Sequence, residues 1–281
     1  MLTGYIVELL VLFGVIFIHE LGHAAAASCL QWRIKEIRLL PFGGVAEVEE
    51  AGNIPVWEEL IVVLAGPAQH LFMIGLALLF LAMGLWDDLW TDYFIQVNLM
   101  IGLFNLLPIL PLDGGKVLQA LISLWLPYYR TLHVGYTVSL ILSAMLTAAA
   151  LGIWNAYGVD LNLLLIGIFL LIHNWFDYRN MTYIFLRFLS GRDQRIQSWL
   201  HSGIALEPLM VSEEIPLKQV MQMLKRERYH MIYICNKQGQ IKQALPEQRV
   251  VNAYLTRNEG VDRANPFHFR YNKNKLSERR T

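Results

Sequence analysis

The stretch LLVLFGVIFIHELGH, Leu9 to His23, is an apolar run that ends in two histidines and a glutamate. In a helix, His19 and His23 project from one face, so both imidazoles can bind a single Zn²⁺. Glu20 lies beside them without being a ligand and can take a proton from water, whose pKa zinc lowers to about 7. Charges at membrane depth cost roughly 2.5–3.5 kcal/mol or more and are usually functional, which argues against a chance match or a merely structural histidine pair. The pattern therefore predicts hydrolysis inside a bilayer.

The composition is that of a polytopic α-helical membrane protein. Of 281 residues, 55% are hydrophobic and 16% are charged, and the mean hydropathy is +0.39. Apolar segments of about 17–25 residues suffice to cross a bilayer. We expect about five crossings, the third of them short, near residues 5–29, 58–85, 92–107, 132–154 and 161–178.

Charge and cysteine content exclude some classes of protein. A formal net charge of zero argues against a globally basic protein that binds nucleic acid. Cys29 lies in an expected span and Cys235 in the distal polar region, so a disulfide framework is not expected. The first segment lacks the basic start and the small-residue cleavage site of a signal peptide.

Basic residues occur on alternate connections between the expected spans. They follow the first, third and last spans, whereas the intervening connections carry aspartates. The basic residues are Arg33, Lys35, Arg38, Lys116, Arg130, Arg179, Arg187, Arg192 and Arg195, and the aspartates are Asp87, Asp88, Asp92 and Asp160. The positive-inside rule then places the metal-binding end of the first span on the cytosolic side.

The connection at 36–49 alternates as a strand does on both sides of Pro41 and a glycine pair. This pattern predicts a short hairpin or a pair of strands at the membrane surface, with a plain loop as the alternative. A free strand edge beside a protease centre could hold an extended substrate through main-chain hydrogen bonds. Phe42, Gly43 and Gly44 are therefore candidate substrate-binding residues.

A catalytic zinc usually has three protein ligands and an open position for water. The candidate for the third ligand is Asp113, with a loop-capping role as the alternative. It follows a segment in which Pro108 and Pro111 break the third span and expose backbone, a break that is tolerated where it lines a polar cavity. The glycine pair after Asp113 permits close backbone approach or a sharp turn, and Asn105 could anchor the substrate. In the second span we interpret His70 as a buried, hydrogen-bonded residue that faces the site.

The polar region after residue 180 predicts a small α+β module. Strands are expected at 208–211 and 231–235, a turn at 236–239, and helices near 216–221 and 248–255, in the order strand, helix, strand, strand, helix. The module holds no plausible set of zinc ligands and no membrane span, so we expect it to be regulatory.

The chain resembles the site-2 protease family of intramembrane zinc metalloproteases. Two motifs carry the resemblance, HELGH at 19–23 and N-x-x-P-x-x-P-x-D-G at 105–114, and it extends through the order of the spans. The resemblance implies ligation of one zinc by His19, His23 and Asp113, with Glu20 as the catalytic base. It also implies regulated intramembrane proteolysis of a membrane-associated protein.

The sequence is similar to the sporulation branch of that family, which removes the pro-sequence of the sigma factor pro-sigma-K in endospore-forming bacteria. The segments LPFGG at 40–44, AGPAQH at 65–70 and PILPLDGG at 108–115 carry this similarity. The branch implies membrane inhibitor proteins, an active site toward the mother-cell cytosol, and a cytosolic CBS domain that binds ATP and engages substrate. A homo-oligomer is compatible with the sequence, and no nucleic-acid partner is expected.

The branch implies six spans with a cytosolic N-terminus, whereas this sequence begins almost at the HELGH helix. We expect the first span to be absent here, or the start codon to be misassigned. The expected domains are a membrane-embedded metalloprotease domain at 1–180, a linker at 181–203, a CBS-like domain at 204–259 and a basic, disordered tail at 260–281.

Three other functions are compatible with parts of the pattern. A CAAX-type membrane metalloprotease also has HExxH in a span, but its third ligand is a glutamate on a Glu-rich helical motif, which this sequence lacks. A non-hydrolytic membrane regulator or transporter that binds zinc would have no need for a base at Glu20. A site-2 protease could also act on a membrane-tethered substrate other than pro-sigma-K.

Overall fold

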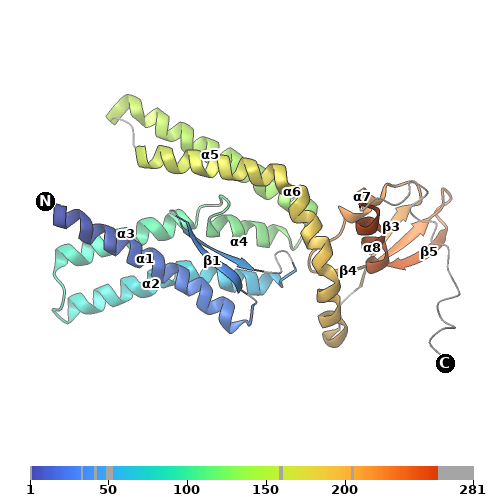
Figure 1. Ribbon diagram of the computed structural model, residues 1–281, viewed down its shortest axis with the longest axis horizontal. Coiled ribbons are helices and arrows are strands. Elements are labelled where there is room, and N and C mark those ends of the chain that lie inside the picture. Colours follow the sequence, from blue (N-terminus) through green and yellow to red (C-terminus); the bar gives the residue numbers. More distant parts are fainter. Residues whose placement is uncertain are drawn as a thin grey trace. The chain divides into compact units, whose positions relative to one another are not determined.

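The computed structural model describes residues 2–32, 34–40, 43–48, 53–157, 161–203 and 206–258. The chain is mostly helical (Figure 1). It divides into two compact units, the first ending at Phe188 and the second beginning at Leu189. The division falls inside one helix, because the segment 181–202, expected as part of a linker, is helical.

The first unit contains six helices or parts of helices and one pair of strands among the described residues. In chain order these are α1 (Leu2–Cys29), β1 (Ile34–Leu40), β2 (Gly43–Val48), α2 (Val56–Ala82), α3 (Asp88–Asn105), α4 (Asp113–Ile122), α5 (Tyr128–Tyr157) and the greater part of α6 (Leu161–Ser202).

Four of these helices are long and apolar enough to cross a membrane. Within the described residues, the qualifying stretches are Ile6–Cys29, Val56–Ala82, Tyr128–Leu151 and Leu161–Asp193. They correspond to four of the five expected crossings. The remaining one, 92–107, corresponds to α3, whose 18 residues extend only about 27 Å against a hydrocarbon core of about 30 Å. Asp88 and Asp92 lower its hydropathy further, so the crossing by α3 stays a prediction.

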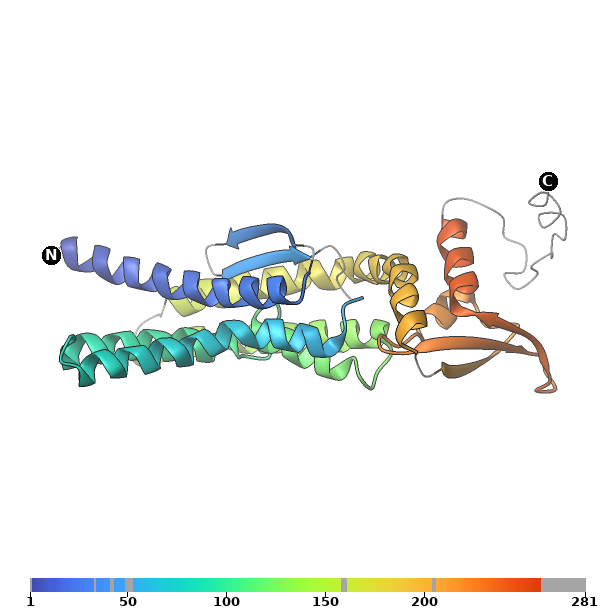
Figure 2. The same ribbon diagram turned by 90° about the horizontal axis from the view of Figure 1, so that it is seen from below.

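Helices α1, α2 and α3 run alongside one another (Figures 1 and 2). Val15, Met73 and Val97, one from each helix, form a buried cluster between them. Gly22 lets α1 approach α2 closely, because a Cβ there would lie 2.7 Å from the carbonyl oxygen of Ala65. Helix α2 continues through Pro67 without interruption. The metal-binding motif is thus presented to two neighbouring helices.

The connection after α1 forms the predicted hairpin. Strands β1 and β2 pair antiparallel, with Leu39 opposite Gly44 and Leu40 opposite Gly43. Strand β2 contacts α1 (Figure 2). The prediction of a strand pair is confirmed, while Phe42, in the turn, lies outside the described residues.

Among the described residues, the second unit contains the end of α6, a three-stranded sheet and two short helices. The strands and short helices are β3 (Leu206–Ser212), α7 (Leu217–Met221), β4 (Tyr229–Cys235), β5 (Ile241–Pro246) and α8 (Glu247–Asn258). Strand β4 is central, parallel to β3 and antiparallel to β5. The order of elements matches the predicted strand, helix, strand, strand, helix. The expected tail at 260–281 lies outside the described residues.

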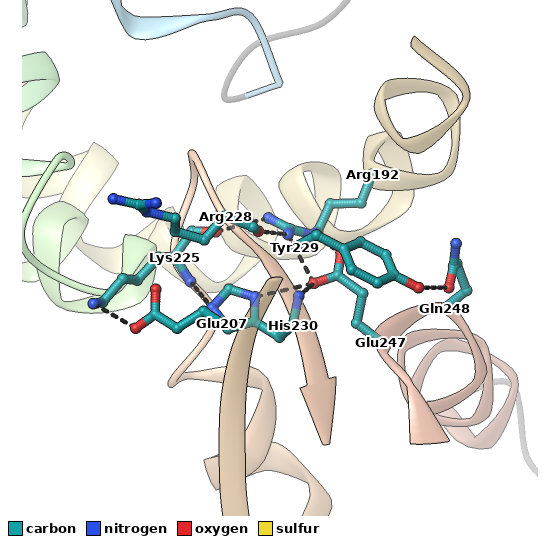
Figure 3. A network of polar contacts seen from close by, with 8 residues as sticks. All are labelled: Arg192, Glu207, Lys225, Arg228, Tyr229, His230, Glu247 and Gln248. Carbon is teal, nitrogen blue, oxygen red and sulfur yellow. Dashed lines mark hydrogen bonds and ion pairs between the residues drawn. The ribbon is translucent and has the colours of Figure 1, made fainter. Parts of the chain in front are cut away.

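A buried ion-pair network ties the end of α6 to this sheet (Figure 3). Arg192 donates from Nε to Glu247 Oε1 at 2.7 Å and from Nη2 to Oε2 at 2.9 Å. His230 donates its backbone N–H to Oε2 at 2.9 Å, and its Nδ1 lies 3.0 Å from the same oxygen. Burial alone raises the pKa of Glu247, but the hydrogen bonds from His230 and the charge of Arg192 together hold it below its usual range. The carboxylate is therefore ionised and neutralised within the unit.

Candidate metal centre

Three buried side chains converge between α1 and the start of α4. His19 and His23 lie one turn apart on α1, with their Nε2 atoms 3.2 Å apart. Asp113, the first residue of α4, places Oδ2 at 3.1 Å from both of these nitrogens. Among the described residues these three form a group that could hold a metal ion. The structure thus brings together the two predicted ligands of α1 and the predicted third ligand, which is 90 residues beyond His23.

The chain between α3 and α4 carries Asp113 into this position. Its prolines interrupt the helical hydrogen bonding after α3, and the backbone N–H and carbonyl of Leu110 bond to side chains of two later helices. The Leu110 N–H donates to Ser139 Oγ of α5 at 2.9 Å, and its carbonyl accepts from Asn174 Nδ2 of α6. Both polar side chains are buried. They were missed in the sequence, although buried polar residues inside apolar spans are a usable signal.

Glycines make the approach of the backbone possible. A Cβ at Gly115 would lie 2.5 Å from the carbonyl carbon of Ile109, and one at Gly114 would meet the carbonyl of Leu106. Close approach, rather than a positive φ, is therefore what these glycines provide. On α2, a Cβ at Gly66 would lie 2.8 Å from the His19 ring and closer still to the ring of His23. The absence of a side chain at Gly66 thus lets α2 pack directly against both imidazoles.

The outer nitrogen of each imidazole is also occupied. His23 Nδ1 lies 2.7 Å from the carbonyl oxygen of Val62, which can only accept, so Nδ1 carries the proton and a neutral His23 presents a bare Nε2. His19 Nδ1 lies 3.0 Å from Nε2 of His70. Metal-binding histidines usually show such a partner on the second nitrogen. As predicted, His70 is buried and faces the site through His19.

The geometry fits a zinc ion. Zinc takes imidazole and carboxylate ligands at about 2.0–2.1 Å, which in a tetrahedral site puts neighbouring ligand atoms about 3.3 Å apart. The observed separations of 3.1 to 3.2 Å agree. Lys116 Nζ lies 3.5 Å from Asp113 Oδ1, the oxygen that does not meet the imidazoles. Two nitrogens and one oxygen thus face a common point and leave a further position.

The other predicted site residues are on α1, on β2, at the end of α3 and in the segment between α3 and α4. Glu20 follows His19 on α1 and is half-buried, as is Asn105 at the end of α3. Pro108 is exposed and Pro111 half-buried in the broken segment. Gly43 and Gly44 begin β2. The substrate-binding roles of Asn105, Pro108, Pro111, Gly43 and Gly44 stay predictions, as does the catalytic role of Glu20.

Comparison with known proteins identifies the family. The model of peptidase family M50 matches residues 7–87 and 82–149. Stage IV sporulation protein FB of Bacillus subtilis is 37% identical over 261 residues, covering 91% of this chain and 86% of that protein. The chain belongs to peptidase family M50. A zinc metalloprotease of Methanocaldococcus jannaschii is 35% identical over 134 residues, covering 46% of this chain and 38% of the relative.

A solved structure of a site-2 protease supports the same assignment. The site-2 protease from Methanocaldococcus jannaschii aligns with a TM-score of 0.50 and 27% identity, covering 60% of this chain and 76% of that one. The M50 chain described here is therefore a membrane metalloprotease of the site-2 type, as the motifs predicted.

Proposed function

We propose that this M50 protease is a zinc-dependent intramembrane endopeptidase in which His19, His23 and Asp113 hold the metal. The observation that carries the proposal is the triangle of ligand atoms with edges of 3.1 to 3.2 Å. A zinc ion there would supply a Lewis acid that polarises the scissile carbonyl and acidifies water.

Glu20 is the proposed general base. It neighbours a ligand without belonging to the triangle, so its carboxylate can take a proton from the attacking water and then pass it to the leaving amine. Asn105, at the end of α3, is proposed to hold the substrate backbone. The burial of the three ligands keeps bulk water from competing for their lone pairs.

The hairpin is the proposed entry point for substrate. A helix in a bilayer satisfies its own backbone, so the scissile bond becomes accessible only after local unwinding, and the extended segment then needs new partners. Strand β2 contacts α1, the helix that carries the histidines. We propose that Phe42, Gly43 and Gly44 pair with the unwound segment, while Pro108 and Pro111 shape the opposite wall.

Cysteine crosslinking tests the entry proposal. Cysteines at positions 42–48 are paired with cysteines around the cleavage site of the substrate, in a Glu20→Gln background that retains uncleaved substrate. Crosslinks between the hairpin and the cleavage site are expected. Crosslinks confined to the second unit would contradict this route while leaving the zinc assignment intact.

The proposed substrate is pro-sigma-K. The similarity to a stage IV sporulation protein along 91% of the chain supports a role in sporulation of an endospore-forming bacterium. We infer an active site on the mother-cell cytosolic side, because basic residues follow the metal-binding end of the first span, and membrane inhibitor proteins as regulators. Another membrane-tethered substrate is the second candidate.

Co-expression in a heterologous host tests reaction and substrate together. A shortened pro-sigma-K that appears with the wild type and not with Glu20→Gln is expected. Processing that persists in Glu20→Gln would contradict the base, and a full-length substrate with active enzyme would favour the second candidate. Zinc transport that appears when the wild type is expressed, with no cleavage of substrate, would instead favour the non-hydrolytic alternative.

We propose that residues 204–259, within the second unit, are a CBS-like regulatory domain. Its order of strands and helices supports this. The resemblance to the sporulation branch is the only argument for ATP as its ligand, and binding of labelled ATP to the full-length protein is the test.

A further inference from the structure

Two buried residues behind His19 have no role in the mechanism above. His70 of α2 is 3% exposed and Asn98 of α3 is fully buried. His19 Nδ1 lies 3.0 Å from His70 Nε2, and His70 Nδ1 lies 3.0 Å from Asn98 Oδ1. This series of hydrogen bonds ends at α3, where Asn98 Nδ2 donates to the carbonyl oxygen of Phe94, one turn earlier on the same helix, at 2.9 Å. We call His70 and Asn98 the α2–α3 relay.

The direction of every hydrogen bond in the relay follows from its last acceptor. The Phe94 carbonyl only accepts, so the Asn98 amide must turn its Nδ2 toward it and its Oδ1 toward His70. His70 Nδ1 therefore carries the proton. Its Nε2 is then an acceptor, and His19 Nδ1 must be the donor, which leaves His19 Nε2 with a bare lone pair toward Asp113.

Packing against α3 also fixes the position of the His70 ring. Gly102 lies one turn after Asn98 on the same face of α3. A Cβ at Gly102 would lie 3.1 Å from His70 Cδ2 and 3.2 Å from Cγ, so α3 contacts the ring through its smallest residue. The His70 ring is therefore confined by Gly102 as well as by its two hydrogen bonds.

The two histidines of α1 are oriented by different means. The Nδ1 proton of His23 is held by the main-chain carbonyl of Val62, which no side-chain substitution removes. His19 depends on two side chains instead. We infer that His70 and Asn98 are positioning residues, which set the tautomer and ring orientation of His19 so that its Nε2 is presented to the metal. This inference rests on the proposed zinc centre and names part of its support.

The test compares His70→Phe with His70→Gln in the full-length protein. Phenylalanine keeps a ring but offers no acceptor, whereas the Gln Oε1 can accept from His19 Nδ1. Zinc affinity is measured by competition with a chromophoric chelator, and the ligand field by the absorption spectrum after Co²⁺ replaces zinc. We expect His70→Phe to lower zinc affinity about 10- to 100-fold and to alter the Co²⁺ spectrum, and His70→Gln to restore most of both.

Asn98→Leu and Ser143→Ala complete the set. Asn98→Leu preserves volume and removes the acceptor for His70, so it should lower zinc affinity less than His70→Phe, and it serves if His70→Phe does not fold. Ser143 is equally buried, and its hydroxyl donates to the carbonyls of Ser139 and Leu140 within α5, so its alanine variant should bind zinc like wild type.

The outcomes separate the relay from the metal site. Wild-type zinc affinity in folded His70→Phe or Asn98→Leu, together with loss of zinc in Asp113→Ala, overturns the relay alone. An equal loss in His70→Phe and His70→Gln overturns the role as hydrogen-bond acceptor. Retention of zinc in Asp113→Ala contradicts the proposed centre itself.

Discussion

The two units of this M50 protease each bury a histidine about 3 Å from a carboxylate, and the two clusters differ in where the protons lie. In the second unit, His230 Nδ1 and Arg192 donate to Glu247, so donors meet acceptors and the charge is neutralised within the chain (Figure 3). In the first unit, the imidazole protons are held on the outer nitrogens, and three lone pairs face one another. Similar separations, 3.0 Å and 3.1 Å, thus accompany an ion pair in the second unit and a set of candidate metal-ligand atoms in the first.

Glu20→Gln carries the largest expected effect, because it removes a proton acceptor while the lone pairs that face the metal stay in place. Proteolysis should fall by about 10²–10⁴-fold, the usual contribution of a general base. Zinc content should match wild type. Cleavage rates and metal content are measured on the same preparation, and a variant that lost zinc would make Glu20 a ligand or a structural residue.

Glu247→Gln should disrupt the second cluster and leave the first unchanged. Removal of one partner of a buried ion pair typically costs about 3–5 kcal/mol. Hydrogen–deuterium exchange of the full-length protein should show faster exchange in β4, β5 and α8, with zinc content unaffected. Loss of zinc in this variant would mean that the two units depend on each other.

The same carboxylate predicts a dependence on pH. The folded pKa of Glu247 lies below its usual value, so its stabilising contribution is present above the unfolded pKa of roughly 4.3 and is lost as the pH falls through the folded pKa. Protection of β4 in the wild type should therefore decline below roughly pH 4. An identical decline in Glu247→Gln would assign the effect to other groups.

Gly66→Ala tests whether the metal-facing atoms can move. The new Cβ would press on both imidazoles from α2, so we expect zinc affinity to fall by about tenfold or more, as when ligand orientation is disturbed. Gly75→Ala, on the same helix with open space around its Cβ, is the matched control and should bind zinc normally. Equal affinities in the two variants would show that the imidazoles are not confined by α2.

Ser139→Ala has the smallest expected effect. It leaves the buried N–H of Leu110 without its acceptor, which costs about 1–3 kcal/mol, and loosens the segment that places Asp113. Ser143→Ala, four residues later, is the control, because it removes a hydroxyl that donates to carbonyls of α5 itself. The free energies of unfolding of the two variants, obtained from thermal melting, should differ by about 1–3 kcal/mol. Equal free energies would mean that Ser139 does not support the segment that places Asp113.

Local periodicity predicted much of the site, and long-range contacts supplied the rest. The pairing of His19 with His23 follows from helical spacing, and the broken segment pointed to Asp113. The partners of that segment, Ser139 and Asn174, are 29 and 64 residues from Leu110. A single sequence does not show which of many polar residues in apolar spans will meet.

In the second unit, too, local patterns were predictable from the sequence and long-range contacts were not. Its order of elements was predictable from alternation and turn residues. The pair formed by Arg192 and Glu247 joins residues 55 positions apart, so local sequence patterns do not predict it.

Zinc per chain in purified wild type, His23→Ala and Asp113→Ala tests the central claim most directly. We predict one zinc per wild-type chain and loss of both zinc and proteolysis in each variant, because each removes one of three converging lone pairs. Zinc content and proteolysis that both remain at wild-type levels in either variant would contradict the assignment of the metal centre.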